Sequence, residues 1–157
     1  GPLISNKQID IVKKYLNLGS NLKKIAEAKL NDKQVYEGFF ISPTLFGEVD
    51  PNHVLAQEEI FGPVQVLIPF DNEDEAIKIA NDTKFGLVAG IWTNDGSRQL
   101  RMAKKLRAGQ VFINNYGAGG GVELPFGGTG HSGFGREKGL EALNSFSTLK
   151  TIAINHG

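Results

Sequence analysis

Apolar and polar residues alternate along the chain with two different periods, which predict helices in some segments and strands in others. Apolar side chains recur at helical spacing in residues 7–18, and Gly19 stands where that helix should end. Residues 39–46 are rich in aromatic and β-branched side chains and predict a strand, in which Pro43 favours a sheet edge or a bend. The pattern in residues 22–30 fits a helix and a strand equally well.

The middle of the chain alternates strands and helices with short connections. Asp50 and Pro51 are typical of a helix start, and we expect this short helix to end near Gln57. The strands expected next are residues 64–70, 86–93 and 110–114, and the helices are residues 72–82 and 97–106, each preceded by Asn and Asp residues that can cap it. This alternation is typical of the α/β fold class with a parallel sheet, whose ligand site lies at the carboxyl ends of the strands.

The composition changes after Tyr116, where a glycine-rich loop begins and a second glycine-rich tract follows at residues 127–135. Residues 138–145 predict a short helix, and residues 148–155 predict a final strand with an apolar end. A terminal strand of this kind exposes a sheet edge in a monomer and invites pairing with a second chain. The alternative is a strand within the chain's own sheet.

Length and charge narrow the functional classes. The 157 residues are enough for one domain with a real core, and 17 basic residues balance 17 acidic ones. The zero net charge gives no reason to expect nucleic acid or a membrane as a partner, and no apolar run reaches the roughly 18 residues of a membrane helix. The histidines lack metal-ligand spacing, so no metal site is predicted. We take the cytoplasm as the default location.

The sequence Gln-Glu-Glu-Ile-Phe-Gly-Pro at residues 57–63 carries the most informative chemistry. Glutamate is uncommon in strands and Pro63 cannot donate a hydrogen bond to a sheet, so the segment predicts a loop. The carboxylate of Glu59 can accept hydrogen bonds from the two hydroxyls of a ribose, and Phe61 can pack against a flat ring. The alternative is a solvated acidic turn with Phe61 in the core.

This segment resembles the cofactor-contacting Glu-x-Phe-Gly-Pro motif of the NAD(P)-dependent aldehyde dehydrogenase superfamily. Three further blocks resemble the same family in the same order: residues 1–5 (Gly-Pro-Leu-Ile-Ser), 38–44 (Gly-Phe-Phe-Ile-Ser-Pro-Thr) and 125–137, which holds Pro-Phe-Gly-Gly and Ser-Gly-Phe-Gly-Arg-Glu. The resemblance covers nearly the whole chain. It implies an α/β fold in which residues 1–147 form the C-terminal part of the catalytic domain and residues 148–157 form an oligomerisation strand and tail.

The resemblance also implies roles for particular residues. Glu59 would bind the ribose on the nicotinamide side of NAD or NADP, with Phe61 beside it, whereas Glu58 is expected to be solvated. Leu87 would approach the nicotinamide, although a plain core leucine explains this residue equally well. The wall of the substrate tunnel would include Asn115, Tyr116, Gly117, Ala118, Gly119 and Phe126.

Catalysis is where the chain departs from the family pattern, because it contains no cysteine. The reaction implied is oxidation of an aldehyde to a carboxylic acid with NAD(P)+, through attack of a cysteine thiolate and activation of water by a glutamate. We expect both residues to lie before Gly1 and no catalytic residue within the chain. The prediction is therefore a C-terminal fragment, inactive alone, of a homo-oligomeric enzyme joined through the final strand. The alternative is a non-catalytic assembly or binding fragment that acts through its exposed sheet edge.

The glycines at positions 128, 130 and 133 match the pattern G-x-G-x-x-G of dinucleotide-binding loops. That pattern needs a buried strand before it, a helix after it and an acidic residue about 20 positions further on. Residues 124–126 do not resemble such a strand, so we expect a loop that packs against other backbone. A self-contained dinucleotide binder is the alternative, and it would require tight NAD binding by this chain.

Overall fold

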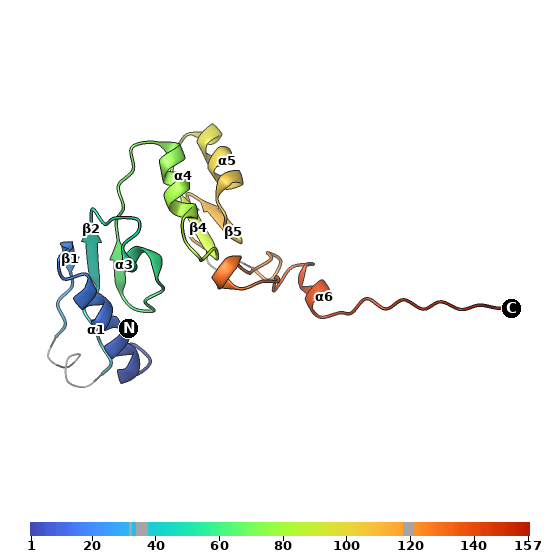
Figure 1. Cartoon of the computed structure of the whole chain (residues 1–157), viewed down its shortest axis with the longest axis horizontal. Coiled ribbons are helices and arrows are strands. Elements are labelled where there is room, and N and C mark those ends of the chain that lie inside the picture. The colour runs from blue at the N-terminus through green and yellow to red at the C-terminus, as the bar shows by residue number, and fades with distance from the viewer. Residues whose placement is uncertain (32, 34–37, 118–120) are drawn as a thin grey trace. The chain divides into compact units, whose positions relative to one another are not determined.

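The structure of the chain is a computed structural model that describes residues 1–31, 33, 38–117 and 121–157 (Figure 1). These residues divide into two compact units, Gly1–Asp71 and Asn72–Gly157, each with a sheet of its own. Both units combine helices with parallel strand pairs, as expected for the α/β fold class.

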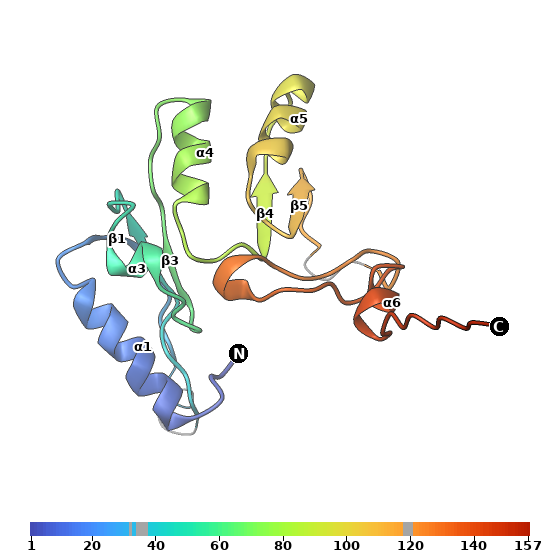
Figure 2. The same ribbon diagram turned by 45° about the vertical axis from the view of Figure 1, so that its right-hand side comes forward.

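The first unit is a three-stranded sheet with a helix packed against it (Figure 2). Its elements in chain order are α1 (Asn6–Leu18), β1 (Lys23–Glu27), β2 (Thr44–Gly47), α3 (Val54–Gln57) and β3 (Val64–Val66). β1 runs antiparallel to β2, and β2 runs parallel to β3. The ambiguous residues 22–30 therefore contain a strand. Of residues 39–46, only the part after Pro43 is in a strand, and proline has no amide hydrogen to donate to the ladder.

The core of the first unit lies where α1 packs on β2. Val12 of α1 and Val49 are almost fully buried, and Phe46, Leu55 and Ile60 complete the cluster. Burial of such apolar side chains is the main force that stabilises a fold. Because Ile60 belongs to this cluster, the core also holds the loop between α3 and β3.

The helix α3 begins later than the sequence indicates. The Asp50 carboxylate accepts a hydrogen bond from the Asn52 amide at 2.7 Å, which forms a turn where the first helical turn was expected. His53 then caps α3, because its Nδ1 accepts a hydrogen bond from the Leu55 amide at 3.2 Å. The helix ends at Gln57, as predicted.

The second unit begins with a helix, which is followed by a strand–helix–strand arrangement in which both strands run the same way. Asn72 and Asp95 cap the two longer helices, by accepting hydrogen bonds at 3.0 Å from the amides of Glu75 and Arg98. The elements are α4 (Glu73–Asn81), β4 (Val88–Ile91), α5 (Gly96–Lys105), β5 (Gln110–Ile113), the 3-10 turn η1 (Gly130–Ser132) and α6 (Ala142–Ser145). The expectation of one parallel sheet is therefore corrected to two sheets, since β3 pairs with β2 and β4 pairs with β5.

The second glycine-rich tract packs backbone against backbone, as predicted. The Thr129 amide donates a hydrogen bond to the Gly86 carbonyl at 3.1 Å. A Cβ atom on Gly109 would overlap the carbonyl oxygen of Gly127, so only glycine fits there. Residues 128–133 contain a 3-10 turn, and no strand of the described chain directly precedes them. They therefore lack the context of a dinucleotide-binding loop.

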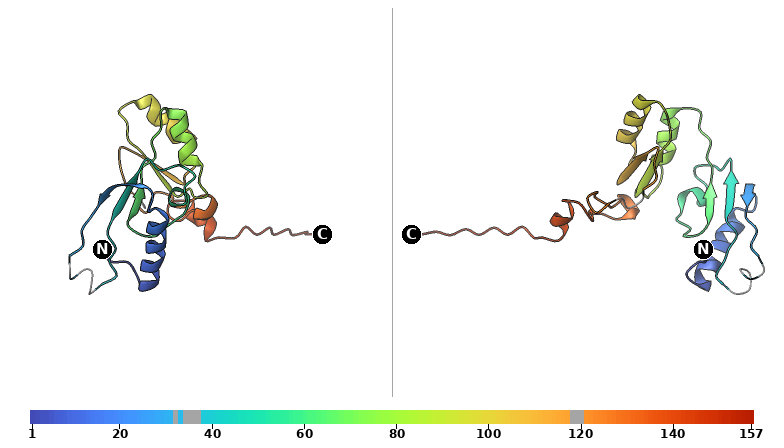
Figure 3. Two further views of the ribbon diagram at one scale, coloured as in Figure 1. Left: turned by 60° about the vertical axis from the view of Figure 1, so that its left-hand side comes forward. Right: turned by 180° about the vertical axis from the view of Figure 1, so that it is seen from behind.

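Residues 148–157 form an exposed extended tail after α6 (Figures 1 and 3). They pair with no strand of the described chain, so the alternative of a strand within the chain's own sheet is not what the structure shows. The helix predicted for residues 138–145 is confined to the short α6. Among the described residues, no helix has the length and apolar character needed to span a membrane.

Candidate functional site

The loop at residues 58–63 joins α3 to β3 and exposes the two side chains singled out in the sequence. Ile60 is 7% exposed and belongs to the core, whereas Phe61 is 71% exposed. Glu59 is exposed too, and no described residue donates a hydrogen bond to it. The alternative that places Phe61 in the core is therefore wrong, because Ile60 takes that position. Glu59 and Phe61 flank the buried side chain and both remain accessible to a ligand.

The helix α1 binds this loop through two polar side chains. The side-chain nitrogen of Gln8 donates hydrogen bonds to the carbonyl oxygens of Ile60 at 3.0 Å and Phe61 at 3.2 Å. The Tyr15 hydroxyl donates to Oε2 of Glu58 at 2.6 Å, and this hydrogen bond raises the pKa of Tyr15 above its ordinary value. Glu58 is therefore exposed but paired, which corrects the expectation that water alone would solvate it.

The backbone of Phe61 adopts a conformation that bulky residues rarely take. Its φ of 54° lies in the left-handed region, which costs free energy for a residue with a Cβ atom. On its C-terminal side, Gly62 packs so closely on α1 that a Cβ atom would lie 2.5 Å from a methyl group of Val12. The carbonyl of Pro63 accepts a hydrogen bond from the Thr44 amide at 2.9 Å. These contacts fix the chain on the C-terminal side of Phe61, and burial of Ile60 fixes the residue before it.

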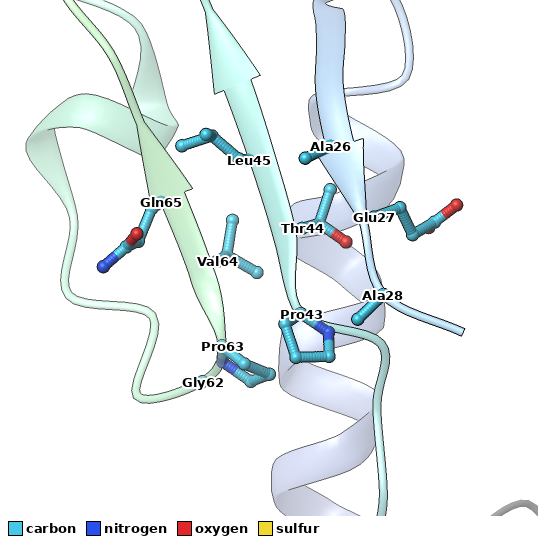
Figure 4. A pocket seen from close by; sticks show the side chains of 10 residues that line it. All are labelled: Ala26, Glu27, Ala28, Pro43, Thr44, Leu45, Gly62, Pro63, Val64 and Gln65. Atoms are coloured by element: carbon cyan, nitrogen blue, oxygen red, sulfur yellow. The ribbon is translucent and has the colours of Figure 1, made fainter. Parts of the chain in front are cut away.

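A cavity of about 520 Å³ lies next to the loop, at the end of the sheet where β2 and β3 begin (Figure 4). Gly62 and Pro63 line it, together with residues of the three strands, but neither Glu59 nor Phe61 does. The hydroxyl of Thr44, one of its polar groups, already donates to the Ser42 carbonyl at 3.0 Å. The cavity also lies at the amino ends of the parallel strands, whereas the sequence indicated a site at their carboxyl ends.

Leu87 precedes β4 in the second unit and is 38% exposed. Its carbonyl accepts a hydrogen bond from the Gln110 amide at 3.1 Å, so its backbone is part of the pairing between β4 and β5. A plain core leucine would be buried, and Leu87 is not. Its side chain is accessible within this unit, as a contact with a ligand requires.

The residues proposed for the tunnel wall separate into two places in the second unit. Asn115 and Tyr116 directly follow β5 and are exposed, and the Tyr116 amide donates to the Asn115 side chain at 2.7 Å. Gly117 is next, with the ring of Phe112 close to it. Ala118 and Gly119 lie outside the described residues.

Phe126 lies near the N-terminal end of β5, whose first residue is Gln110. It follows Pro125, whose carbonyl accepts a hydrogen bond from Nε2 of Gln110 at 3.1 Å. Its amide donates to the Glu137 carbonyl at 2.6 Å, and the ammonium of Lys138 lies 5.5 Å from the centre of its ring. Within the described residues, no hydrogen bond or ring contact joins Phe126 to Asn115 or Tyr116.

Three residues that shape these places were missed at the level of sequence. Gln8 and Tyr15 bind the loop, yet in the sequence they are only two positions of an amphipathic helix. Asn114 has a φ of 49°, and its side-chain amide both accepts from and donates to the backbone of Thr93, each at 2.9 Å. Asparagine tolerates positive φ better than most residues, which is the one signal that was present.

Metal chemistry has no support in the described part of the chain, where no three His, Asp or Glu side chains gather in a way that could hold an ion. The accessible groups are carboxylate, phenyl and amide groups. They can bind hydroxyls and flat rings, as in a nucleotide.

Comparisons with known proteins point the same way as the motifs. The model of the aldehyde dehydrogenase family matches residues 1–152. The NADP/NAD-dependent aldehyde dehydrogenase PuuC of Escherichia coli K12 is 43% identical over 155 residues, which are 99% of this chain and 30% of that protein. The chain thus spans about a third of the length of the curated relatives it matches.

Solved structures agree with these relatives. A Burkholderia cenocepacia protein whose name assigns it to the aldehyde dehydrogenases superposes with a TM-score of 0.92 and 57% identity, over 100% of this chain and 33% of that one. An aldehyde dehydrogenase of Mycobacterium tuberculosis, solved with NAD+, gives a TM-score of 0.90 and 39% identity, over 100% of this chain and 32% of that one.

Proposed function

The chain belongs to the aldehyde dehydrogenase family, and we propose that it forms the C-terminal part of the catalytic domain of an enzyme that oxidises an aldehyde to a carboxylic acid with NAD or NADP. In this proposal residues 1–147 are the catalytic portion, and residues 148–157 are an oligomerisation strand and tail. The Escherichia coli relative is named as an NADP/NAD-dependent aldehyde dehydrogenase, and the similar structure from Mycobacterium tuberculosis holds NAD+.

The observation that carries the proposal is the exposed carboxylate of Glu59, which lies on a loop held by Gln8 and accepts no hydrogen bond from the described residues. Its two oxygens can accept hydrogen bonds from the two hydroxyls of the nicotinamide ribose, and charged acceptors make stronger hydrogen bonds than neutral ones. Phe61 presents a ring next to that carboxylate and can pack against the sugar or the nicotinamide. The pair therefore binds one end of the cofactor.

The residues of the second unit supply the remaining contacts in this proposal. Leu87 approaches the nicotinamide with its accessible side chain. Asn115, Tyr116 and Gly117 after β5, and Phe126 beside its start, contribute to the wall that guides the aldehyde. Ala118 and Gly119 are assigned to the same wall by the sequence motif alone.

The test is the substitution Glu59→Gln in the complete protein that carries residues 1–157. Loss of the charge weakens hydrogen bonds from the ribose, so the KM for the cofactor should rise about 10- to 100-fold while kcat changes far less. The matched control is Glu48→Gln, which neutralises an exposed glutamate of the same unit whose partner is Lys23. An unchanged cofactor KM in Glu59→Gln would overturn the proposed role. The chain of residues 1–157 alone, which has no cysteine, should form no NADH from aldehyde and NAD+.

The exposed tail supports a second part of the proposal, assembly of the enzyme into a homo-oligomer. Leu149, Ile152 and Ile154 are 99%, 75% and 70% exposed on an extended segment that pairs with no strand of the described residues. Such an edge gains hydrogen bonds and apolar burial when it pairs with a sheet of a second copy. Removal of residues 148–157 should lower the molecular mass measured by analytical ultracentrifugation to that of a smaller assembly. An unchanged mass would contradict this role of the tail.

A further inference from the structure

Two segments of the second unit are joined backbone to backbone next to Phe126. Phe126 and Glu137 exchange two hydrogen bonds, of 2.6 and 2.7 Å, which form an antiparallel bridge. Two residues after Glu137, the amide of Gly139 donates a hydrogen bond to the carbonyl of Val122 at 2.8 Å. The segment that contains Phe126 is therefore held to the other segment both before and after Lys138.

Lys138 lies between these two contacts and has an unusual backbone conformation. Its φ of 64° is in the left-handed region, where a residue with a Cβ atom persists only if its surroundings over-determine the conformation. The hydrogen bonds of Glu137 and Gly139 supply that constraint on the two sides. Lys138 is half-buried, and its ammonium lies over the ring of Phe126, 5.5 Å from the ring centre. The backbone that carries this cation is thus fixed beside the ring.

The ammonium of Lys138 occupies the part of Phe126 that attracts cations. The faces of an aromatic ring carry negative charge and the edge carries positive charge, so a cation binds over a face. Here the chain supplies that cation itself. A second cation at the same ring would meet a like charge, which costs free energy, whereas a neutral group meets only an apolar surface. The ring is therefore suited to contact a neutral group.

The proposed tunnel wall also lacks the group of aromatic rings that usually binds quaternary ammonium ions. Such ions are recognised by several rings that surround the charge. Among the described residues, no other aromatic ring contacts that of Phe126. Residues 117–121, which follow Tyr116, are all glycine or alanine, so this part of the sequence adds no ring.

We propose that Lys138 is a specificity-determining residue, whose ammonium over the ring of Phe126 makes this wall favour neutral aldehydes over aldehydes that carry a quaternary ammonium group. This proposal rests on the function proposed above, in which Phe126 contributes to the wall that guides the aldehyde. Lys138 has no assigned part in the chemical step. Its effect is on which substrate the wall accepts.

The experiment uses two aldehydes of nearly equal size and shape that differ in charge. Betaine aldehyde carries a trimethylammonium group, and 3,3-dimethylbutanal has carbon in place of the nitrogen. We would measure kcat/KM for both at saturating cofactor, in the complete protein that carries residues 1–157. Because hydration of the free aldehydes affects every variant alike, the decisive quantity is the change in the ratio of the two kcat/KM values.

The test variants are Lys138→Met and Lys138→Gln, which remove the charge and retain an unbranched side chain. Lys138→Arg keeps a cation at the same position. The matched control is Lys104→Met, which removes the charge of an exposed lysine of α5 and so reports any effect of net charge alone. The two neutral variants differ in polarity, so the comparison survives if one of them folds poorly.

Both neutral variants should raise kcat/KM for betaine aldehyde, relative to that for 3,3-dimethylbutanal, about 5- to 20-fold, the scale of a cation–ring interaction gained and a like charge removed. The value for 3,3-dimethylbutanal should stay within about 2-fold of wild type. Lys138→Arg and Lys104→Met should both keep the wild-type ratio.

Three results would overturn the proposal. In the first, neither neutral variant changes the ratio. In the second, kcat/KM falls equally for both aldehydes, which would show that Lys138 only stabilises the structure. In the third, Lys104→Met shifts the ratio as much as Lys138→Met does, which would show that the net charge of the protein, and not the cation at Phe126, decides the preference.

Phe126→Leu separates this proposal from the proposed function. If Phe126→Leu changes kcat/KM for both aldehydes and the neutral variants of Lys138 leave the ratio unchanged, only the specificity role fails. If neither Phe126→Leu nor Lys138→Met changes any of these values, Phe126 is not part of the wall, and the specificity role fails together with that assignment. The ribose-binding role of Glu59 is tested independently by Glu59→Gln.

Discussion

The two units of the chain bury their apolar residues to very different extents. The first unit contains most of the buried hydrophobic side chains of the described residues, namely Ile9, Val12, Phe46, Val49, Leu55 and Ile60, whereas the second contributes Ile77 and Ile91. In the second unit, large apolar residues such as Trp92 and Phe134 are 72% and 101% exposed. The first unit thus closes a core of its own, and the second presents apolar surface of the kind that binding partners or further protein cover.

The two units also join their helices in different ways. In the first, α1 is attached to β2 through apolar packing around Val12 and Phe46. In the second, α4 and α5 are linked on the surface by ion pairs, in which Glu73 accepts hydrogen bonds from Arg98 at 3.2 Å and from Arg101 at 2.7 Å. Apolar burial is worth more than an exposed ion pair. The loop with the proposed cofactor contacts belongs to the first unit, where Ile60 anchors it in the apolar core.

The largest expected effect on stability comes from removing a buried aromatic ring from the core of the first unit. Phe46 is 2% exposed, so Phe46→Ala removes a buried ring and leaves a cavity, which should lower the free energy of unfolding by about 3–5 kcal/mol. Denaturant unfolding followed by amide exchange of residues in β2 and α1 measures this loss.

The matched variant in the second unit is Phe134→Ala, which makes the same substitution at a fully exposed ring. Its effect on the stability of the chain should stay within about 0.5 kcal/mol. Equal losses in the two variants would show that the contrast between the units is wrong.

The smallest expected effect is the pH dependence of the contact between α4 and α5. The hydrogen bond from Arg101, assisted by Arg98, lowers the pKa of Glu73 to about 2 from the ordinary 4.5. A carboxyl group whose folded pKa is lowered stabilises the fold above its unfolded pKa, and this contribution is lost as the pH falls through the folded value. The contribution of Glu73 should therefore be complete above pH 4.5 and disappear towards pH 2.

This contribution is small because the guanidinium groups are solvent-exposed and salt screens them. The measurement is the amide exchange of α4 and α5 between those two pH values, with Glu73→Gln as the variant that should lack this part of the pH dependence. Raised salt should weaken the effect in the wild type and leave Glu73→Gln unchanged. A pH profile that is the same in both proteins would contradict the assignment.

Much of the secondary structure followed from local signals. The helical spacing before Gly19 and the capping residues Asn72 and Asp95 were sufficient to predict α1, α4 and α5. Where two local signals competed, the prediction failed: Asp50 and Pro51 can begin a helix, but the Asp50 carboxylate forms a turn with Asn52 instead. The prediction of which strands pair failed for a different reason. β2 and β3 are separated by a long connection, and hydrophobic periodicity carries no information about contacts between such distant segments.

The sequence by itself determined which residues carry the chemistry. The adjacent carboxylates, Phe61 and the proline after Gly62 were sufficient to predict a loop, and the absence of cysteine was sufficient to remove thiol catalysis from these residues. Only the tertiary structure decided which side chain of the loop is buried and what holds the others outward. Gln8 reaches residues 60 and 61 across more than 50 positions of sequence, and Tyr15 reaches Glu58 across 43. Such contacts depend on the packing of α1 against β2, since side chains far apart in the chain meet only where the core brings their elements together.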